Sequence, residues 1–170
     1  MTDKKIYGSL VCLKRLNPAD QKQINVWNKD SEVSQYREIY QLKAKKLSHI
    51  GFGIYDQESS KLIGDIGISL IDPKNKHAEI GMTIGDKSYW GKGYGTDLVK
   101  TILNFCFKIL DLNKVYLDVW EENKRAIDCY LKCGFKRDGV LRDHVFREGI
   151  YHNKWIMSIL KREWQERNRS

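Results

Sequence analysis

The front half of the chain alternates apolar and polar residues with the period of two that is typical of β-strands. This alternation predicts four strands, over residues 9–16, 50–56, 62–71 and 77–84. In the third strand, one face is predicted to carry Leu62, Ile66, Ile68 and Leu70. In the fourth, the core face is predicted to carry Ala78, Ile80, Met82 and Ile84. Glu79 is therefore expected on the polar face of its strand.

Helical spacing predicts four helices between and after these strands. The first starts at Asn17-Pro18-Ala19-Asp20, which combines an N-cap, a first-turn proline and an acid at the third position, and it runs to about Trp27. A second, less regular one is predicted over residues 32–47. The third carries apolar residues at 98, 102, 105, 106 and 109, and the fourth covers residues 123–132.

Three more strands are predicted in the back half, over residues 115–120, 135–147 and 151–160. The resulting order, β-α-α-β-β-β-α-β-α-β-β, predicts an α+β fold with an antiparallel front half and a crossover in the middle. At 170 residues the chain is long enough for one domain with a full core, so residues 1–170 are expected to form a single domain.

Composition and charge limit where the protein is expected to be located and which partners it is expected to bind. No apolar run approaches the ~20 residues of a membrane span, so no membrane partner is expected. The start of the chain lacks the apolar core of a secretory signal, and its four cysteines form no CxxC pair. We therefore expect the four cysteines to be free thiols and the protein to be cytoplasmic. The net charge of +8 is concentrated at the two ends, with ten basic and five acidic residues in positions 1–50.

A glycine-rich stretch, Trp90-Gly91-Lys92-Gly93-Tyr94-Gly95-Thr96, leads directly into the third predicted helix. Glycines allow the backbone to approach an anion closely, and N–H groups and the positive end of the helix dipole would point at it. The loop therefore indicates a phosphate-binding turn. By itself it also fits an ordinary tight turn, because it lacks both the G-x-G-x-x-G spacing and the G-K-[ST] ending.

A second block, Asn123-Lys124-Arg125-Ala126-Ile127-Asp128-Cys129-Tyr130-Leu131-Lys132-Cys133-Gly134-Phe135, follows at a distance that changes this interpretation. Together the two blocks resemble the GNAT acyltransferase superfamily, in the branch that acetylates ribosomal-protein N-termini, polyamines and amino sugars. The resemblance implies a mixed, twisted central sheet of about seven strands, with splayed middle strands and about four helices. It also implies an acetyl-CoA-dependent N-acetyltransferase.

The resemblance also implies where acetyl-CoA binds. Its pantetheine arm would pair with an exposed strand edge, and its pyrophosphate would meet the N–H groups of the glycine loop. The implied cofactor-binding residues are Met82, Thr83, Ile84, Gly91, Lys92, Gly93, Tyr94, Gly95, Thr96 and Asn123. Asn123 also fits the role of a helix cap. One departure is Trp90, which stands where the family usually has Gln or Arg and so removes a polar side chain from the phosphate site.

Two residues are predicted to carry the chemistry, in which an amine attacks the thioester carbonyl and a thiolate leaves. Tyr130 resembles the family tyrosine that hydrogen-bonds this thiolate; a core tyrosine is the alternative. Reference pKa values of ~10 for a phenol and ~8.5 for a thiol favour a positioned donor over full proton transfer. Glu79 is the candidate base, acting through water; a structural carboxylate is the alternative. The histidines show no metal-ligand spacing, so no metal is expected.

The acceptor is predicted to bind near residues 17–48, where Trp27, Glu32 and Tyr36 resemble a W-x-x-D-x-E-V element of the family. The +5 charge of residues 1–50 favours a nucleotide-linked amino sugar or a protein or peptide N-terminus over a polyamine. A polyamine acetyltransferase and a non-catalytic CoA-binding sensor stay open as alternatives, as does a homodimer. A nucleic-acid partner is not expected, because no arginine–aromatic platform is visible.

Overall fold

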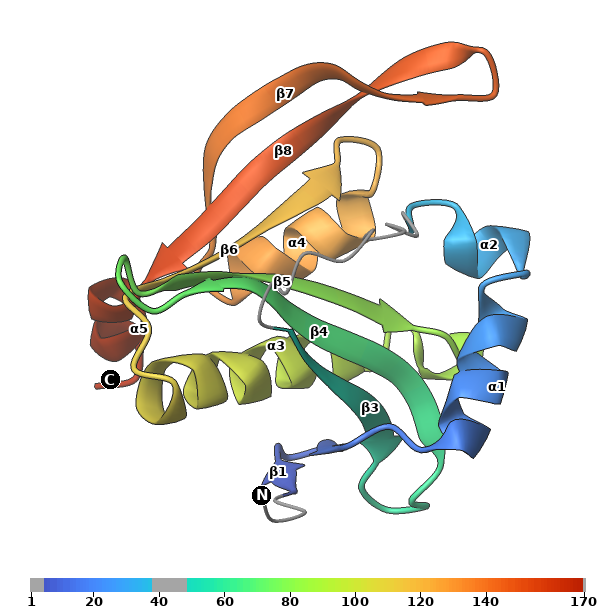
Figure 1. The fold of residues 1–170 in the computed structure, drawn as a ribbon, viewed down its shortest axis with the longest axis horizontal. Helices are drawn as coiled ribbons and strands as arrows, with labels where there is room; N and C mark the ends of the chain where they lie inside the picture. Colours follow the sequence, from blue (N-terminus) through green and yellow to red (C-terminus); the bar gives the residue numbers. More distant parts are fainter. Residues whose placement is uncertain (1–4, 38–48, 170) are drawn as a thin grey trace.

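The computed structural model describes residues 5–37 and 49–169. Its centre is an eight-stranded sheet in the order β1-β2-β3-β4-β5-β6-β8-β7 (Figure 1). The strands are β1 (Ile6–Tyr7), β2 (Val11–Lys14), β3 (Ile50–Asp56), β4 (Leu62–Asp72), β5 (His77–Ile84), β6 (Lys114–Trp120), β7 (Lys136–Arg147) and β8 (Ile150–Leu160). Among the strand pairs of the described residues, β5–β6 is parallel and the others are antiparallel. The predicted α+β sheet with an antiparallel front half and a central crossover is confirmed.

The helices are α1 (Pro18–Trp27), α2 (Ser31–Ser34), α3 (Tyr94–Asn104), α4 (Lys124–Lys132) and α5 (Lys161–Arg167). A 3-10 turn, η1 (Lys87–Tyr89), precedes α3, and a π-helical turn, η2 (Phe105–Ile109), follows it. The predicted start of α1 is confirmed. The Asn17 side chain accepts hydrogen bonds from the backbone N–H groups of Ala19 and Asp20, and the Asp20 carboxylate accepts one from the N–H of Asn17.

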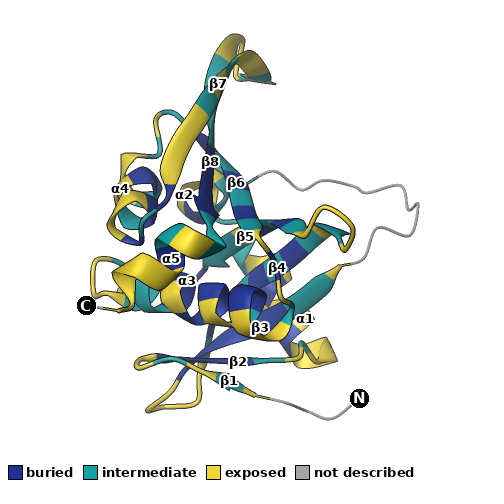
Figure 2. Cartoon of the chain, turned by 90° about the vertical axis from the view of Figure 1, so that its left-hand side faces the viewer, coloured by how far each residue is buried: buried dark blue, intermediate teal, exposed yellow. Residues whose placement is uncertain are grey.

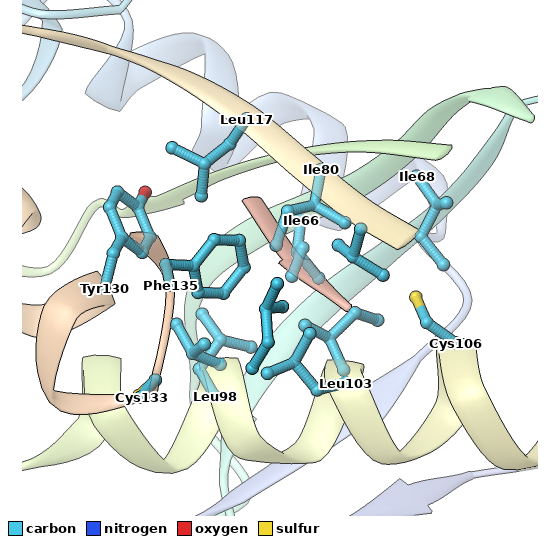
Figure 3. Close-up of a cluster of buried hydrophobic side chains, with 14 of the residues drawn as sticks. Ile66, Ile68, Ile80, Leu98, Leu103, Cys106, Leu117, Tyr130, Cys133 and Phe135 are labelled. Carbon is cyan, nitrogen blue, oxygen red and sulfur yellow. The ribbon is translucent and has the colours of Figure 1, made fainter. Parts of the chain in front are cut away.

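The apolar core lies between α3, α4 and one face of the sheet. Leu98, Ile102 and Leu103 of α3 are buried in one cluster with Ala78 and Ile80 of β5. Figure 3 shows this cluster, and Figure 2 shows buried residues gathered around α3 while much of β7 is exposed. Because residues along a strand alternate between faces, Glu79 and Gly81 lie on the opposite face of β5. That face carries the site.

Two predictions about local structure are wrong. Leu70 was expected in the core but is exposed, because the ladder between β4 and β5 shifts register between Ser69 and Asp72 and Leu70 has a φ of 50°. Of the second predicted helix, over residues 32–47, the part that the structure describes is helical only in α2, whose C-cap is Gln35. The Asp30 side chain caps its start. The remainder of that prediction, residues 38–47, lies outside the described residues.

Two elements were missed. Strand β1 pairs with β2 and brings the sheet to eight strands, against the seven predicted. No element was predicted after residue 160, but residues 161–167 form α5, in which Trp164 is buried against Phe107 with ring centroids 5.3 Å apart. The segment is too short for its helical period to be visible in the sequence, and burial of a single tryptophan against the core stabilises it.

Candidate active site

The two central strands separate part-way along their length. Pairing between β5 and β6 includes only His77–Lys114, Ala78–Val115 and Glu79–Tyr116. Beyond these pairs, β5 stays paired with β4 as far as Ile84, and β6 stays paired with β8 as far as Trp120. The edge of β5 that faces β6 therefore has no strand partner from residue 80 to residue 84. Apart from the Ile84 carbonyl, which accepts a hydrogen bond from Trp90, the backbone N–H and C=O groups on this edge are left to pair with an extended ligand.

This gap opens into a cleft of about 940 Å³. Its cofactor half, as we call it, is formed by the free edge of β5 at residues 80–84, the loop at residues 90–96 and the facing side of α4. Its acceptor half is formed by α1, α2 and the sheet face that carries Asp65, Glu79 and Asp118. The volume is in the range of a small-molecule site.

In the loop, Gly91 and Gly93 have φ values of 72° and 88°, a left-handed conformation that strains any residue with a Cβ. Gly93 is the N-cap of α3, and no side chain caps that helix. The N–H groups of its first turn are thus left for an anion, where the positive end of the helix dipole also acts. Gly95 and Thr96 of this turn line the cleft.

Trp90 connects this loop to both neighbouring elements. Its indole Nε1 donates a hydrogen bond of 2.8 Å to the carbonyl oxygen of Ile84, at the end of β5. The guanidinium of Arg125, from α4, stacks on its ring 3.7 Å from the centroid. Both residues line the cleft. Position 90 offers no polar group to a phosphate, but its ring holds a positive charge beside the loop.

Two loop residues predicted to bind the cofactor, Lys92 and Tyr94, do not line the cleft. Lys92 is exposed and is not part of the cleft wall. The Tyr94 hydroxyl donates a hydrogen bond of 2.9 Å to Asp56, in the β3–β4 hairpin. This hydrogen bond, together with burial, raises the pKa of Tyr94 to about 12. Because the Tyr94 hydroxyl is engaged in this way, Tyr94 can take part in the predicted cofactor binding only through its backbone N–H group.

Helix α4 presents Asn123 and Tyr130 to the cleft. The Asn123 side chain accepts a hydrogen bond of 3.3 Å from the N–H of Ala126, so it does cap the helix, and its amide NH₂ remains as a donor. The Tyr130 ring is buried beside Phe135, and Figure 3 shows Tyr130 at one end of the apolar cluster, with its hydroxyl on the side of Leu117. Burial, reinforced by the charges of Cys129 and Asp118, raises the pKa of Tyr130. A phenol with a raised pKa stays protonated and acts as a hydrogen-bond donor.

Glu79 lies at the point where β5 and β6 separate. It pairs across the sheet with Ser69 on one side and Tyr116 on the other, and it lines the cleft. Burial, together with the charge of Glu79, raises the pKa of Tyr116. Glu79 is thus a carboxylate within the same cleft as Tyr130, which is the arrangement that its predicted role requires.

Sequence reasoning missed two charged pairs in the acceptor half. Lys154 of β8 is 2% exposed and its ammonium lies 2.9 Å from the carboxylate of Asp118. Arg37 donates two hydrogen bonds, of 2.9 and 2.8 Å, to the carboxylate of Asp65. The alternation Tyr116, Asp118, Trp120 marks the polar face of β6 and would have indicated Asp118. No comparable pattern marks Lys154, whose burial depends on tertiary packing.

The three predicted acceptor residues have different surroundings. Tyr36 lines the cleft and packs on Trp120, with ring centroids 5.8 Å apart. Glu32 lies at the rim, where its carboxylate is 2.9 Å from the ammonium of Lys87. Trp27 does not line the cleft; its ring covers Gly85, where a Cβ would come within 2.1 Å of it. Trp27 therefore packs α1 onto the end of β5.

Comparison with known proteins now identifies the family. The family model described as "Acetyltransferase (GNAT) domain" matches residues 11–136. The chain belongs to the GNAT acetyltransferase family. As in the sequence-based expectation, it is an acetyl-CoA-dependent N-acetyltransferase, and the free edge of β5 and the uncapped turn at Gly93 fit that cofactor.

Several GNAT relatives resemble the chain over most of its length. "Uncharacterized N-acetyltransferase p20" of Bacillus licheniformis is 31% identical over 92% of this chain and 89% of the relative. The spermidine N(1)-acetyltransferase of Vibrio cholerae is 27% identical over 95% of this chain and 99% of the relative. A crystal structure of spermidine N-acetyltransferase from Vibrio cholerae, in complex with CoA and spermine, has a TM-score of 0.80 at 27% identity and covers 92% of this chain and 99% of that one.

Two further observations concern partners. Within residues 5–37 and 49–169, no helix is long and apolar enough to span a membrane. The same part of the chain contains no group of three or more His, Cys, Asp or Glu side chains that could hold a metal ion.

Proposed function

We propose that this GNAT enzyme acetylates a primary amine of a small cationic acceptor. The observation that carries the proposal is the excess of acidic over basic side chains on one sheet face of the acceptor half, where three carboxylates, Asp65, Glu79 and Asp118, lie with two cations, Arg37 and Lys154. Carboxylates along a partly desolvated cleft attract an ammonium group and disfavour an anion. The proposal is also supported by relatives that are named spermidine N(1)-acetyltransferases, because spermidine is a small cationic amine.

The charge of the first 50 residues had favoured a nucleotide-linked amino sugar or a protein N-terminus. Of the basic residues from that segment that the structure describes, only Arg37 lines the cleft, and it is paired with Asp65. The described basic residues of this segment therefore add no unpaired positive charge to the cleft wall. A protein N-terminus is the second candidate, because the putative ribosomal N-acetyltransferase YdaF of Bacillus subtilis is 32% identical over 66% of this chain.

Acetyl-CoA supplies the thioester that the amine attacks, so the bond from nitrogen to the acetyl carbon forms as the carbon–sulfur bond breaks. The Tyr130 hydroxyl donates a hydrogen bond to the departing sulfur. Glu79 accepts, through water, the proton that the amine loses. For an alkyl amine with a pKa near ~10.4, reaching the neutral form at pH 7 requires ~4.6 kcal/mol, against ~1.4 kcal/mol for an α-amino group near ~8. A base is therefore more important for a polyamine than for an N-terminus.

The direct test is thiol release from acetyl-CoA with spermidine, glucosamine and a peptide with a free N-terminus. Spermidine is expected to be the fastest acceptor. A clear preference for the peptide would select the second candidate, and binding of CoA without turnover of any amine would indicate a sensor.

Replacement of Tyr130 by Phe tests the proposed donor. Loss of one hydrogen bond to developing charge is expected to lower kcat about 10-fold or more. CoA affinity, measured by calorimetry, should change little, because the hydroxyl contacts only the reacting sulfur. Unchanged kcat in Tyr130→Phe would assign Tyr130 to the core alone.

A further inference from the structure

The side chains of Trp90 and Arg125 meet in the cofactor half of the cleft. Trp90 begins the glycine loop, whereas Arg125 lies in the first turn of α4, and both residues line the cleft wall. The Arg125 guanidinium carbon lies 3.7 Å from the centroid of the Trp90 ring, which is a contact distance for a guanidinium stacked on an aromatic face. The stack therefore joins the loop to α4.

The Trp90 ring is itself held in place. Its Nε1 donates a hydrogen bond of 2.8 Å to the carbonyl oxygen of Ile84, the last residue of β5. The free edge of β5 is where an extended pantetheine arm can pair, and the turn that follows Gly93 is where an anion can bind. Because the diphosphate of CoA connects its pantetheine arm to its nucleotide, we expect it between these two features, next to Trp90.

The Arg125 guanidinium keeps its N–H groups available for a ligand. Stacking uses the face of the guanidinium, while its N–H donors point outward in the plane of the group. Within the described residues, no hydrogen bond or ion pair involves this guanidinium, and Asp128, one turn further along α4, forms no ion pair with it. Arg125 is exposed and stays charged at any physiological pH. It is thus an oriented cation whose N–H edge no described residue occupies.

The negative charge of a diphosphate exceeds what the first turn of α3 balances. The helix dipole places roughly half an elementary charge at that turn, whereas each phosphate of the diphosphate carries a negative charge. A guanidinium adds a full positive charge and can bind two phosphate oxygens through parallel hydrogen bonds. The turn after Gly93 and the Arg125 side chain are therefore complementary, and together they can bind one diphosphate from two sides.

We propose that Trp90 is a positioning residue, which holds the Arg125 guanidinium with its N–H edge toward the diphosphate of CoA. Arg125 adds positive charge to the main-chain donors of the loop. The proposal concerns binding of the cofactor and not transfer to an amine, so CoA affinity tests it without turnover. An enzyme that binds CoA as expected but acetylates no amine would contradict the proposed function and leave this inference intact.

Replacement of Arg125 tests the contact with the diphosphate. Arg125→Ala should weaken CoA binding, measured by calorimetry, about 10- to 100-fold, the value of a hydrogen bond to a charged group. Dephospho-CoA, which lacks the 3′-phosphate, should lose affinity by the same factor, because it retains the diphosphate. Lys124→Ala is the matched control: it removes a positive charge from the same turn, but Lys124 lies over the Trp155 ring and does not line the cleft. It should change the Kd for CoA by less than about twofold at physiological salt.

Replacement of Trp90 separates the stack from the hydrogen bond to Ile84. Trp90→Leu removes both and should weaken CoA binding about fivefold, the value of an exposed cation–π contact. Trp90→Phe keeps an aromatic face for the guanidinium but cannot donate to Ile84, and it should recover most of the affinity. In an Arg125→Ala background, Trp90→Leu should change the Kd by less than about twofold, because the group that the ring positions is gone.

Several results would overturn the proposal. Equal losses in Lys124→Ala and Arg125→Ala would show that only the general positive charge of α4 matters. A loss in Arg125→Ala for CoA but not for dephospho-CoA would assign Arg125 to the 3′-phosphate. Equal losses in Trp90→Phe and Trp90→Leu, or the same effect of Trp90→Leu with and without Arg125, would show that Trp90 acts on the loop and not on the guanidinium.

Discussion

The two halves of the cleft are made of different kinds of groups. The cofactor half relies on main chain: the unpaired edge of β5 and the N–H groups that follow Gly93. The acceptor half relies on side chains from strands far apart in the sequence, such as Asp65, Asp118 and Lys154. Backbone groups recognise a cofactor whatever the surrounding side chains, whereas side chains select the acceptor. One fold can therefore keep its cofactor and exchange its acceptor.

The largest difference between the two halves is expected when the buried ion pair of the acceptor half, Asp118–Lys154, is broken. Asp118→Ala removes the carboxylate 2.9 Å from the nearly buried Lys154 ammonium and should lower the free energy of unfolding by about 3 kcal/mol. The double variant Asp118→Ala, Lys154→Met should recover most of this loss, because an apolar pair replaces a buried charge. Urea unfolding measures both.

Lys136→Ala is the control for that experiment, because its ion pair with Glu163 is on the surface and its side chain is 70% exposed. It should lower stability by less than about 1 kcal/mol. Equal losses in Asp118→Ala and Lys136→Ala would show that the acceptor half does not depend on a buried pair.

An intermediate effect is expected in the main chain of the cofactor half. Gly93→Ala places a Cβ at a φ of 88° and should re-aim the first N–H groups of α3, weakening CoA binding about 10- to 100-fold, the value of one hydrogen bond to a charged group. Gly149→Ala, at a φ of 84° in the β7–β8 turn, is the matched control. Both should lose about 1 kcal/mol of stability. Only Gly93→Ala should change the Kd for CoA in calorimetry.

The smallest effect concerns Cys129, a side chain of the cofactor half. A hydrogen bond from Cys133, assisted by one from Thr96, lowers the pKa of Cys129 to about 7. Because the thiolate is the reactive form, alkylation by iodoacetamide should rise as pH increases through about 7. Acetyl-CoA at ~four times its Kd should slow it about fivefold, in proportion to the free protein.

Mass spectrometry after proteolysis locates the alkylated cysteine. Cys106 is the internal control, because it is fully buried and burial raises its pKa to about 12, so it should stay unmodified in the folded protein. Alkylation of Cys129 that acetyl-CoA leaves unchanged would place the cofactor away from α4.

The incorrect sequence-based predictions concern features that depend on contacts between distant parts of the chain, as the acceptor half of the cleft does. Leu70 continued a regular alternation, but a bulge in the ladder with β5 turns it to solvent, and only the partner strand determines a bulge. Helix α5 is stabilised by packing of Trp164 on Phe107, a contact across 57 positions that no local pattern contains. Likewise, Trp27 was grouped with the acceptor residues by its motif, yet it packs on Gly85.

The sequence by itself determined the order of strands β2 to β8 and of helices α1, α3 and α4 among them, the core face of β5 and the glycine turn before α3, because these depend on residues within one or two turns of each other. It also determined the family, through two local blocks. Only the tertiary structure decided where β5 and β6 separate and which charged side chains lie in the acceptor half. Those features depend on register between distant strands, and register is set by packing of the whole sheet.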